Sequence, residues 1–238
     1  MISLDNIAQF LAQFFAVDRF VNDPSGVYVP STRPIGRFGL ALEPWPQLAD
    51  WAIAERLDGL LLHRPWKLQP HQLATDVGVV AYHLAFDERL TLSFNPRLAE
   101  GLGLSKVEVL GEKEGRAIGM LGEISAQNFA SYCCYLDEVF NGQEEARAGV
   151  QSMVRRVAVV GAMTDALVRE AVARGADIYI TGQLRQPAQA AVLETGISVV
   201  GVGHHRCEQW GLRALAGVLR ERWSRLEVVL ADSKEEKA

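Results

Sequence analysis

Short apolar runs alternate with segments of helical spacing along the chain. The runs 58–63 and 77–82 are short and rich in Leu or Val, as buried strands are. Five prolines between residues 22 and 46 predict loops and short strands there, because proline lacks the donor that helices and central strands need. Up to residue 140, we also expect helices at 4–16, 47–56, 69–76, 96–102 and 125–140, and a pair of strands within 106–124.

The second half of the chain continues this alternation after an expected loop at 141–149. We expect strands at 157–160, 178–181, 197–202 and 226–230, and helices at 164–174, 184–194 and 207–223. Strands that alternate with helices indicate an α/β fold with a largely parallel or mixed sheet. We expect a single unit made of two interleaved α/β halves, about 1–125 and 126–238.

The two halves share a weak internal echo. In the first half, the strand 58–63, a helix and the strand 77–82 lead into His83-x-x-x-Asp87. In the second half, the strand 177–181, a helix and the strand 197–202 lead into His204-x-x-x-Glu208. Two halves related by a pseudo-twofold axis would bring these strand ends face to face, and there we expect the site.

Three of the five histidines, His63, His83 and His204, follow predicted strands. Asp87 and Glu208 each stand four residues after a histidine, so a helix that opens there would present both side chains on one face. Imidazole nitrogen with carboxylate oxygen suits Zn, Mn, Fe or Co better than Ca or Mg. A single histidine at a strand end is usually structural, but the repeated pairing favours a metal site.

Composition narrows the function classes and the compartment. The net charge is -5, and no basic block is longer than Arg155-Arg156, so we expect no nucleic-acid partner. No apolar run approaches the roughly 20 residues of a membrane span, and residues 1–18 predict an amphipathic helix instead of a signal peptide. Cys133 and Cys134 are adjacent among only three cysteines, which implies no disulfide framework and favours a cytoplasmic location.

Several motifs together resemble the Nif-three-like family, whose members are also described as dinuclear-metal-centre proteins and GTP cyclohydrolase type 2 homologues. The resemblance covers residues 48 to 216, in the order and spacing of the family. The motifs that carry it are Leu62-His63-Arg64-Pro65, Tyr82–Asp87, Asn95–Leu104, Gly175–Gly182, Gly203–Glu208 and Gly211–Leu215. The family's Trp-Asp-Asn-x-Gly-Leu opening remains only as Asn22–Gly26.

The resemblance implies a two-metal site between two related α/β halves with mixed sheets. His63, His204 and Glu208 correspond to the ligands of one ion, and Asp87 to a ligand of the other. The second ligand histidine of the family is Arg64 here, and a guanidinium cannot ligate. We therefore expect one divalent ion, held by His63, His204 and Glu208. Arg64 would then pair with Asp87 or point at a substrate anion. The alternative is that Arg64 turns to solvent and His83 becomes a ligand.

Two further family positions differ, because Gln183 replaces the usual Glu and Cys207 a common Ser. The resemblance implies a metal-dependent hydrolase that acts on a small molecule of the phosphorylated or nucleotide-like kind, with His83 or His205 as general acid or base. The alternative is a non-catalytic regulatory protein that binds a metal or another ligand through a degenerate site. The resemblance also implies a homo-oligomer, often a ring-shaped hexamer.

Overall fold

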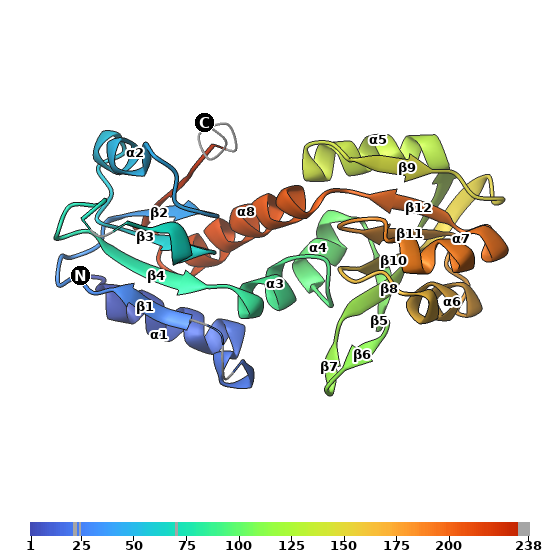
Figure 1. Ribbon diagram of the computed structural model, residues 1–238, viewed down its shortest axis with the longest axis horizontal. Helices are drawn as coiled ribbons and strands as arrows, with labels where there is room; N and C mark the ends of the chain where they lie inside the picture. The colour runs from blue at the N-terminus through green and yellow to red at the C-terminus, as the bar shows by residue number, and fades with distance from the viewer. Residues whose placement is uncertain (21–22, 24, 70, 233–238) are drawn as a thin grey trace. The chain divides into compact units, whose positions relative to one another are not determined.

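The chain divides into two compact units in the computed structural model, which describes residues 1–20, 23, 25–69 and 71–232 (Figure 1). Unit 1 comprises residues 1–86 and 211–238, and unit 2 comprises residues 87–210. Unit 2 is thus an insertion in the sequence of unit 1. The division falls within two continuous helices, α3 (Leu84–Leu90) and α8 (His204–Arg222).

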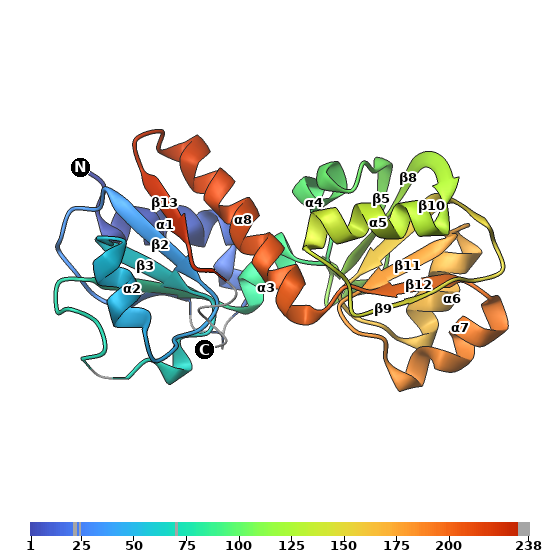
Figure 2. The ribbon, with the colours of Figure 1, turned by 90° about the horizontal axis from the view of Figure 1, so that it is seen from above.

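Unit 1 is built on a five-stranded sheet in the order β1-β4-β3-β2-β13. Its strands are β1 (Ser25–Val29), β2 (Arg37–Ala41), β3 (Gly59–Leu62), β4 (Gly78–Tyr82) and β13 (Glu227–Leu230). All neighbouring strands are parallel except β1, which is antiparallel to β4. The helices α1 (Leu4–Phe15) and α2 (Leu48–Ala54) lie on opposite sides of the sheet, and η1 (Val17–Arg19) and η2 (Pro65–Lys67) are short 3-10 turns (Figures 1 and 2).

The central strands of unit 1 are apolar throughout because both of their faces are covered. Every residue of β3 and β4 is buried. On one side, α1 buries the stripe Leu4, Ile7, Leu11 and Phe15, whose spacing follows the helical repeat. On the other side, Trp45, Trp51 and Ala52 pack with Leu60, Leu62 and Val79.

Unit 2 is built on a six-stranded mixed sheet in the order β5-β8-β10-β11-β12-β9. Its strands are β5 (Ser105–Val109), β8 (Gly119–Asn128), β9 (Glu145–Arg147), β10 (Met153–Val160), β11 (Ile178–Thr181) and β12 (Ser198–Gly201), beside a small ribbon of β6 (Glu112–Lys113) and β7 (Arg116–Ala117). Its helices are α4 (Pro96–Gly101), α5 (Phe129–Phe140), α6 (Asp165–Ala173) and α7 (Gln189–Thr195), which follows η3 (Gln186–Ala188).

Alternate residues of β10 serve the two faces of this sheet. Val157 and Val159 belong to the core that α5 covers with residues such as Leu136. Ala158 and Val160 belong to the core on the side of α6 and α7. Figures 1 and 2 show α5 on one side of the sheet and α6 with α7 on the other. The expected α/β fold with mixed sheets is confirmed.

Three segments differ from the sequence-based expectation. The described residues of the segment 69–76 do not form a helix, since His71 adopts a left-handed conformation (φ 61°) that no right-handed helix contains. Residues 125–128 continue β8, because they pair with β10 up to Asn128. The expected loop 141–149 contains β9, a three-residue strand antiparallel to β12.

The division into halves near residue 125 does not coincide with the two units. Residue 125 lies in β8, which pairs with β10 in the middle of the unit 2 sheet. A boundary at that point would cut a single strand that pairs with β10 on both sides of residue 125. The expected opening motif Asn22–Gly26 lies partly outside the described residues, which include Asp23 but neither Asn22 nor Pro24.

The internal echo is present in the topology of both units. In unit 1, three parallel neighbours, β2, β3 and β4, are followed in the sheet order by the antiparallel edge strand β1. In unit 2, the parallel neighbours β10, β11 and β12 are followed in the same way by the antiparallel edge strand β9. One carboxylate performs the same task in each. Oδ2 of Asp58 accepts from the N–H groups of Gly36 and Arg37 at 2.9 Å, and Oδ2 of Asp177 accepts from Arg155 and Arg156 at 2.8 and 2.9 Å.

The strand register shows that the two histidine motifs are offset by one residue in this repeat. Leu62 pairs with Ala81, and the equivalent Thr181 pairs with Gly201. Counting onward, His83 corresponds to Gly203, and Leu84, the first residue of α3, corresponds to His204, the first residue of α8. The matching of His83 with His204 in the sequence echo was therefore wrong by one position.

Within the described part of the chain, no helix is both long and apolar enough to cross a lipid bilayer.

Candidate metal centre

His63 stands at the carboxyl end of β3 and is fully buried. Its Nδ1 lies 2.9 Å from the backbone oxygen of Tyr82, the last residue of the neighbouring strand β4. A carbonyl oxygen can only accept, so Nδ1 of the neutral ring carries the proton and Nε2 carries the lone pair. Metal-binding histidines are oriented by this kind of contact.

His83 follows β4 directly, and a carboxylate orients its ring. Nδ1 of His83 lies 3.0 Å from Oδ1 of Asp23, whose side chain is only 5% exposed. The other oxygen of Asp23 accepts from the N–H of Leu84 at 2.8 Å and thereby caps the first turn of α3. A carboxylate on Nδ1 makes Nε2 a stronger metal ligand. Sequence reasoning assigned no role to Asp23, although it lies within the recognised opening motif.

Asp87 completes the group from the first turn of α3, four residues after His83, which directly precedes this helix. One donor atom each from His63, His83 and Asp87 lie within 4.8 Å of one another. The two imidazole rings are 5.1 Å apart between centroids. Two neutral imidazole nitrogens with one carboxylate fit a divalent transition ion such as Zn, Mn, Fe or Co.

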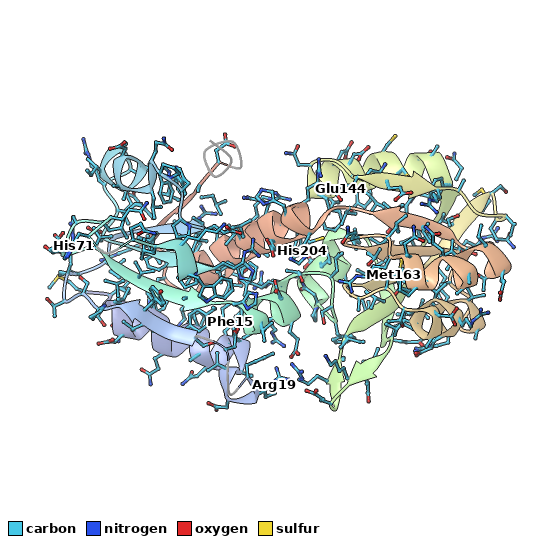
Figure 3. All side chains as sticks on the ribbon, viewed as in Figure 1. Phe15, Arg19, His71, Glu144, Met163 and His204 are labelled. Carbon is cyan, nitrogen blue, oxygen red and sulfur yellow. The ribbon has the colours of Figure 1, made fainter. Side chains whose placement is uncertain are left out.

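The second predicted pair, His204 and Glu208, lies one helical turn apart on α8, where Figure 3 labels His204. Nε2 of His204 is 2.8 Å from Oε1 of Glu208. The carboxylate is 1% exposed and the imidazole is 73% exposed, so the pair joins a buried oxygen to an accessible ring. The helical spacing of this pair agrees with the sequence expectation. Its assignment to the same ion as His63 stays a prediction.

Cys207 lies between these two residues and is not a thiolate at neutral pH. Burial and the nearby carboxylate of Glu208 raise the pKa of the Cys207 thiol well above its ordinary value. The sulfur lies 3.1 Å from the backbone oxygen of Gly203, to which the thiol donates. His205, the second residue of α8, is half-buried, and its expected role as a general acid or base stays a prediction.

Arg64 binds a carboxylate of its own unit. Its Nε lies 2.7 Å from Oε1 of Glu43, and Nζ of Lys67 lies 3.1 Å from the other oxygen. Burial disfavours the charge of Glu43, but the hydrogen bonds from Arg64 and Lys67 outweigh it and lower the pKa of this carboxyl. The Arg64 side chain is mostly buried and does not turn to solvent. The pairing of Arg64 with Asp87 stays a prediction.

We expect Asp23→Asn to weaken binding of the first divalent ion about ten- to hundredfold, because the ring of His83 loses its charged partner. The affinity is measured by competition with a chromophoric chelator. Asp50→Asn is the matched control, since Asp50 is an exposed carboxylate of the same unit, on α2. Equal affinities of the two variants would remove Asp23 from the account of the centre.

Comparisons with known proteins agree on one family. The family model described as Duf34/NIF3 (NGG1p interacting factor 3) matches residues 2–237. Curated relatives named GTP cyclohydrolase 1 type 2 homolog include one from Neisseria meningitidis serogroup B, 26% identical over 207 residues, which are 81% of this chain and 82% of that protein. Another, from Yersinia pestis, is 28% identical over 225 residues, which are 88% of this chain and 89% of that protein.

Solved structures show the same fold. Protein ybgI, described as of unknown function, superposes with a TM-score of 0.77 at 20% identity, over 97% of this chain and 98% of that chain. Reduced HcgD from Methanocaldococcus jannaschii superposes with a TM-score of 0.71 at 21% identity, with the same coverage of 97% and 98%. The resemblance inferred from the motifs is confirmed, and the chain belongs to the Duf34/NIF3 family.

Proposed function

We propose that this protein is a metal-dependent hydrolase for a small, nucleotide-like substrate, with one divalent ion held by His63, His83 and Asp87. The observation that carries the proposal is the convergence of their donor atoms within 4.8 Å. Both histidines also have Nδ1 in contact with an acceptor, which directs Nε2 to the ion. A bound divalent ion lowers the pKa of water and polarises the bond to be cleaved.

The ligand set changes the roles of two residues. When Nε2 of His83 binds the ion and Nδ1 contacts Asp23, neither nitrogen of this ring is left to move a proton. We therefore assign His83 to the metal and keep His205 as the candidate general acid or base. The family resemblance adds His204 and Glu208 to the centre. In that role the buried carboxylate of Glu208 would supply a further negative charge.

A test of hydrolysis uses protein purified without a His tag, stripped of metal, and reconstituted with Zn or Mn. Phosphoesterase and cyclohydrolase substrates are assayed with the stripped and reconstituted forms. We expect activity only after reconstitution, and we expect Asp87→Asn to lose it while Asp50→Asn keeps it. Full metal binding without turnover of any substrate would instead support a non-catalytic regulatory protein, the function that the Arg64 replacement favours.

Arg64→His restores the ligand type that the family resemblance implies at this position. We expect the bound metal to rise from about one toward about two equivalents per chain, because a neutral imidazole replaces a cation that repels the second ion. Elemental analysis of both proteins measures the stoichiometry. Arg33→His is the control, since Arg33 is an arginine of the same unit paired with Asp58 and Asp76. An unchanged count in Arg64→His would contradict the role given to Arg64.

The protein's assembly and location are also part of the proposal. We infer a closed homo-oligomer, in the form of a ring-shaped hexamer, and a cytoplasmic location. The location is supported by Cys133, Cys134 and Cys207, all of which are free thiols. Light scattering at micromolar concentration tests the assembly, and a monomer would contradict it.

A further inference from the structure

Trp66 is an exposed aromatic residue in direct contact with a proposed metal ligand. It lies in η2, four residues after Leu62, the last residue of β3, and 54% of it is exposed. Its ring centroid lies 4.9 Å from that of His83, and the two ring planes are nearly perpendicular at 79°. A perpendicular contact covers at most one indole face, so this tryptophan presents apolar surface to solvent beside the centre.

Two cationic side chains, those of Arg64 and Lys67, flank Trp66 in the sequence. Arg64 and Lys67 both contact the carboxylate of Glu43. Arg64 is mostly buried, whereas the Lys67 side chain is 78% exposed and able to turn toward a ligand. An aromatic face beside a mobile ammonium group matches a planar ring that carries an anionic group.

We propose that Trp66 is a substrate-recognition residue that stacks on a planar heteroaromatic ring, while Lys67 binds a phosphate of the same molecule. The inference rests on the proposed function, because it places the ring beside the ion held by His63, His83 and Asp87. Its own support is the contact between Trp66 and His83. A molecule bound at the imidazole of His83 would lie within reach of the indole.

The experiment compares three probes on the zinc-loaded protein by isothermal titration calorimetry. A nucleoside 5′-monophosphate carries both recognition groups, the free nucleoside carries only the ring, and ribose 5-phosphate carries only the phosphate. We expect the wild-type protein to bind the nucleotide most tightly. Trp66→Ala should lower the affinity for the nucleotide and for the nucleoside about tenfold, as the loss of one base–aromatic stack does. The affinity for ribose 5-phosphate should stay unchanged.

Three variants sharpen the result. Trp66→Phe should recover part of the lost affinity, because phenylalanine keeps an aromatic face. Lys67→Ala should lower the affinity for the two phosphorylated probes only. Ile53→Ala is the control, since Ile53 is an apolar residue of the same unit that is 71% exposed. It should bind all three probes as the wild-type protein does.

The outcomes separate the two proposals. Equal binding of the three probes by the wild-type protein, or an unchanged nucleotide affinity in Trp66→Ala, would overturn the role of Trp66. A lower oligomer size of Trp66→Ala with unchanged affinities would place this residue at a subunit contact and would also overturn it. Absence of metal binding would refute the proposed function. The titrations repeated on metal-free protein would still test the role of Trp66, because they measure whether the wild-type protein binds ring-containing probes more tightly than Trp66→Ala does.

Discussion

His63→Ala is expected to reduce bound metal from about one equivalent per chain to less than about a tenth, because the centre loses one of its three protein ligands. His63 is the only fully buried member of the group among the described residues, and the carbonyl of Tyr82 fixes its ring. Elemental analysis after gel filtration measures the metal content.

His71→Ala is the control for this loss. His71 belongs to the same unit but is exposed, in the segment after η2 (Figure 3). We expect it to keep the full equivalent of metal. His83→Ala is the second variant and guards against a folding defect, since His83 is less buried than His63. A folded His63→Ala protein that keeps its metal would refute the ligand set.

Gly149→Ala is expected to lower the free energy of unfolding by roughly 3 kcal/mol, the upper part of the range for steric overpacking. A Cβ at this position would lie 2.1 Å from the backbone oxygen of Gly196 and 2.6 Å from the backbone nitrogen of Ser198. The close approach is held by two hydrogen bonds. The N–H of Gly149 donates to Oγ of Ser198 at 3.0 Å, and the N–H of Val150 donates to the oxygen of Gly196 at 2.8 Å.

The same substitution in open space provides the comparison. Gly217 lies inside α8, and a Cβ there would meet no atom within 4 Å. Because alanine favours a helix interior over glycine, Gly217→Ala should raise stability by about 0.5–1 kcal/mol. Urea unfolding followed by circular dichroism measures both variants. A loss smaller than 1 kcal/mol in Gly149→Ala would show that the segment after β9 can move away from Gly196 at little cost.

Local patterns were sufficient to predict the central strands and the part of the centre that they position. The runs around Leu60 and Val80 are apolar because both faces of the sheet are covered, and such runs are visible in the sequence. Strands β3 and β4 are parallel neighbours, so the histidines after them come together at one edge. This proximity of His63 and His83 follows from the two predicted strands and from their parallel pairing, which brings their carboxyl ends to the same edge of the sheet.

Features that depend on contacts distant in the sequence were not predictable. Asp23 contacts the ring of His83 from 60 residues earlier in the sequence, and no local pattern marks an aspartate as the partner of that ring. Strand β9 has only three residues and exists because the edge of β12 is available for pairing. The segment 69–76 has helical spacing, but Gln72 uses its side chain to bind the oxygen of Trp45, which stabilises a turn.

The order of the segments also has a consequence for synthesis on the ribosome. Unit 2 is complete once Trp210 has emerged, whereas the sheet of unit 1 waits for β13, whose pairing with β2 joins residues about 190 positions apart. Until then β2 is an open edge that is apolar from Phe38 onward. A chain that stops before β13 would therefore carry a finished second unit and a strand ready to pair with another molecule, which favours aggregation.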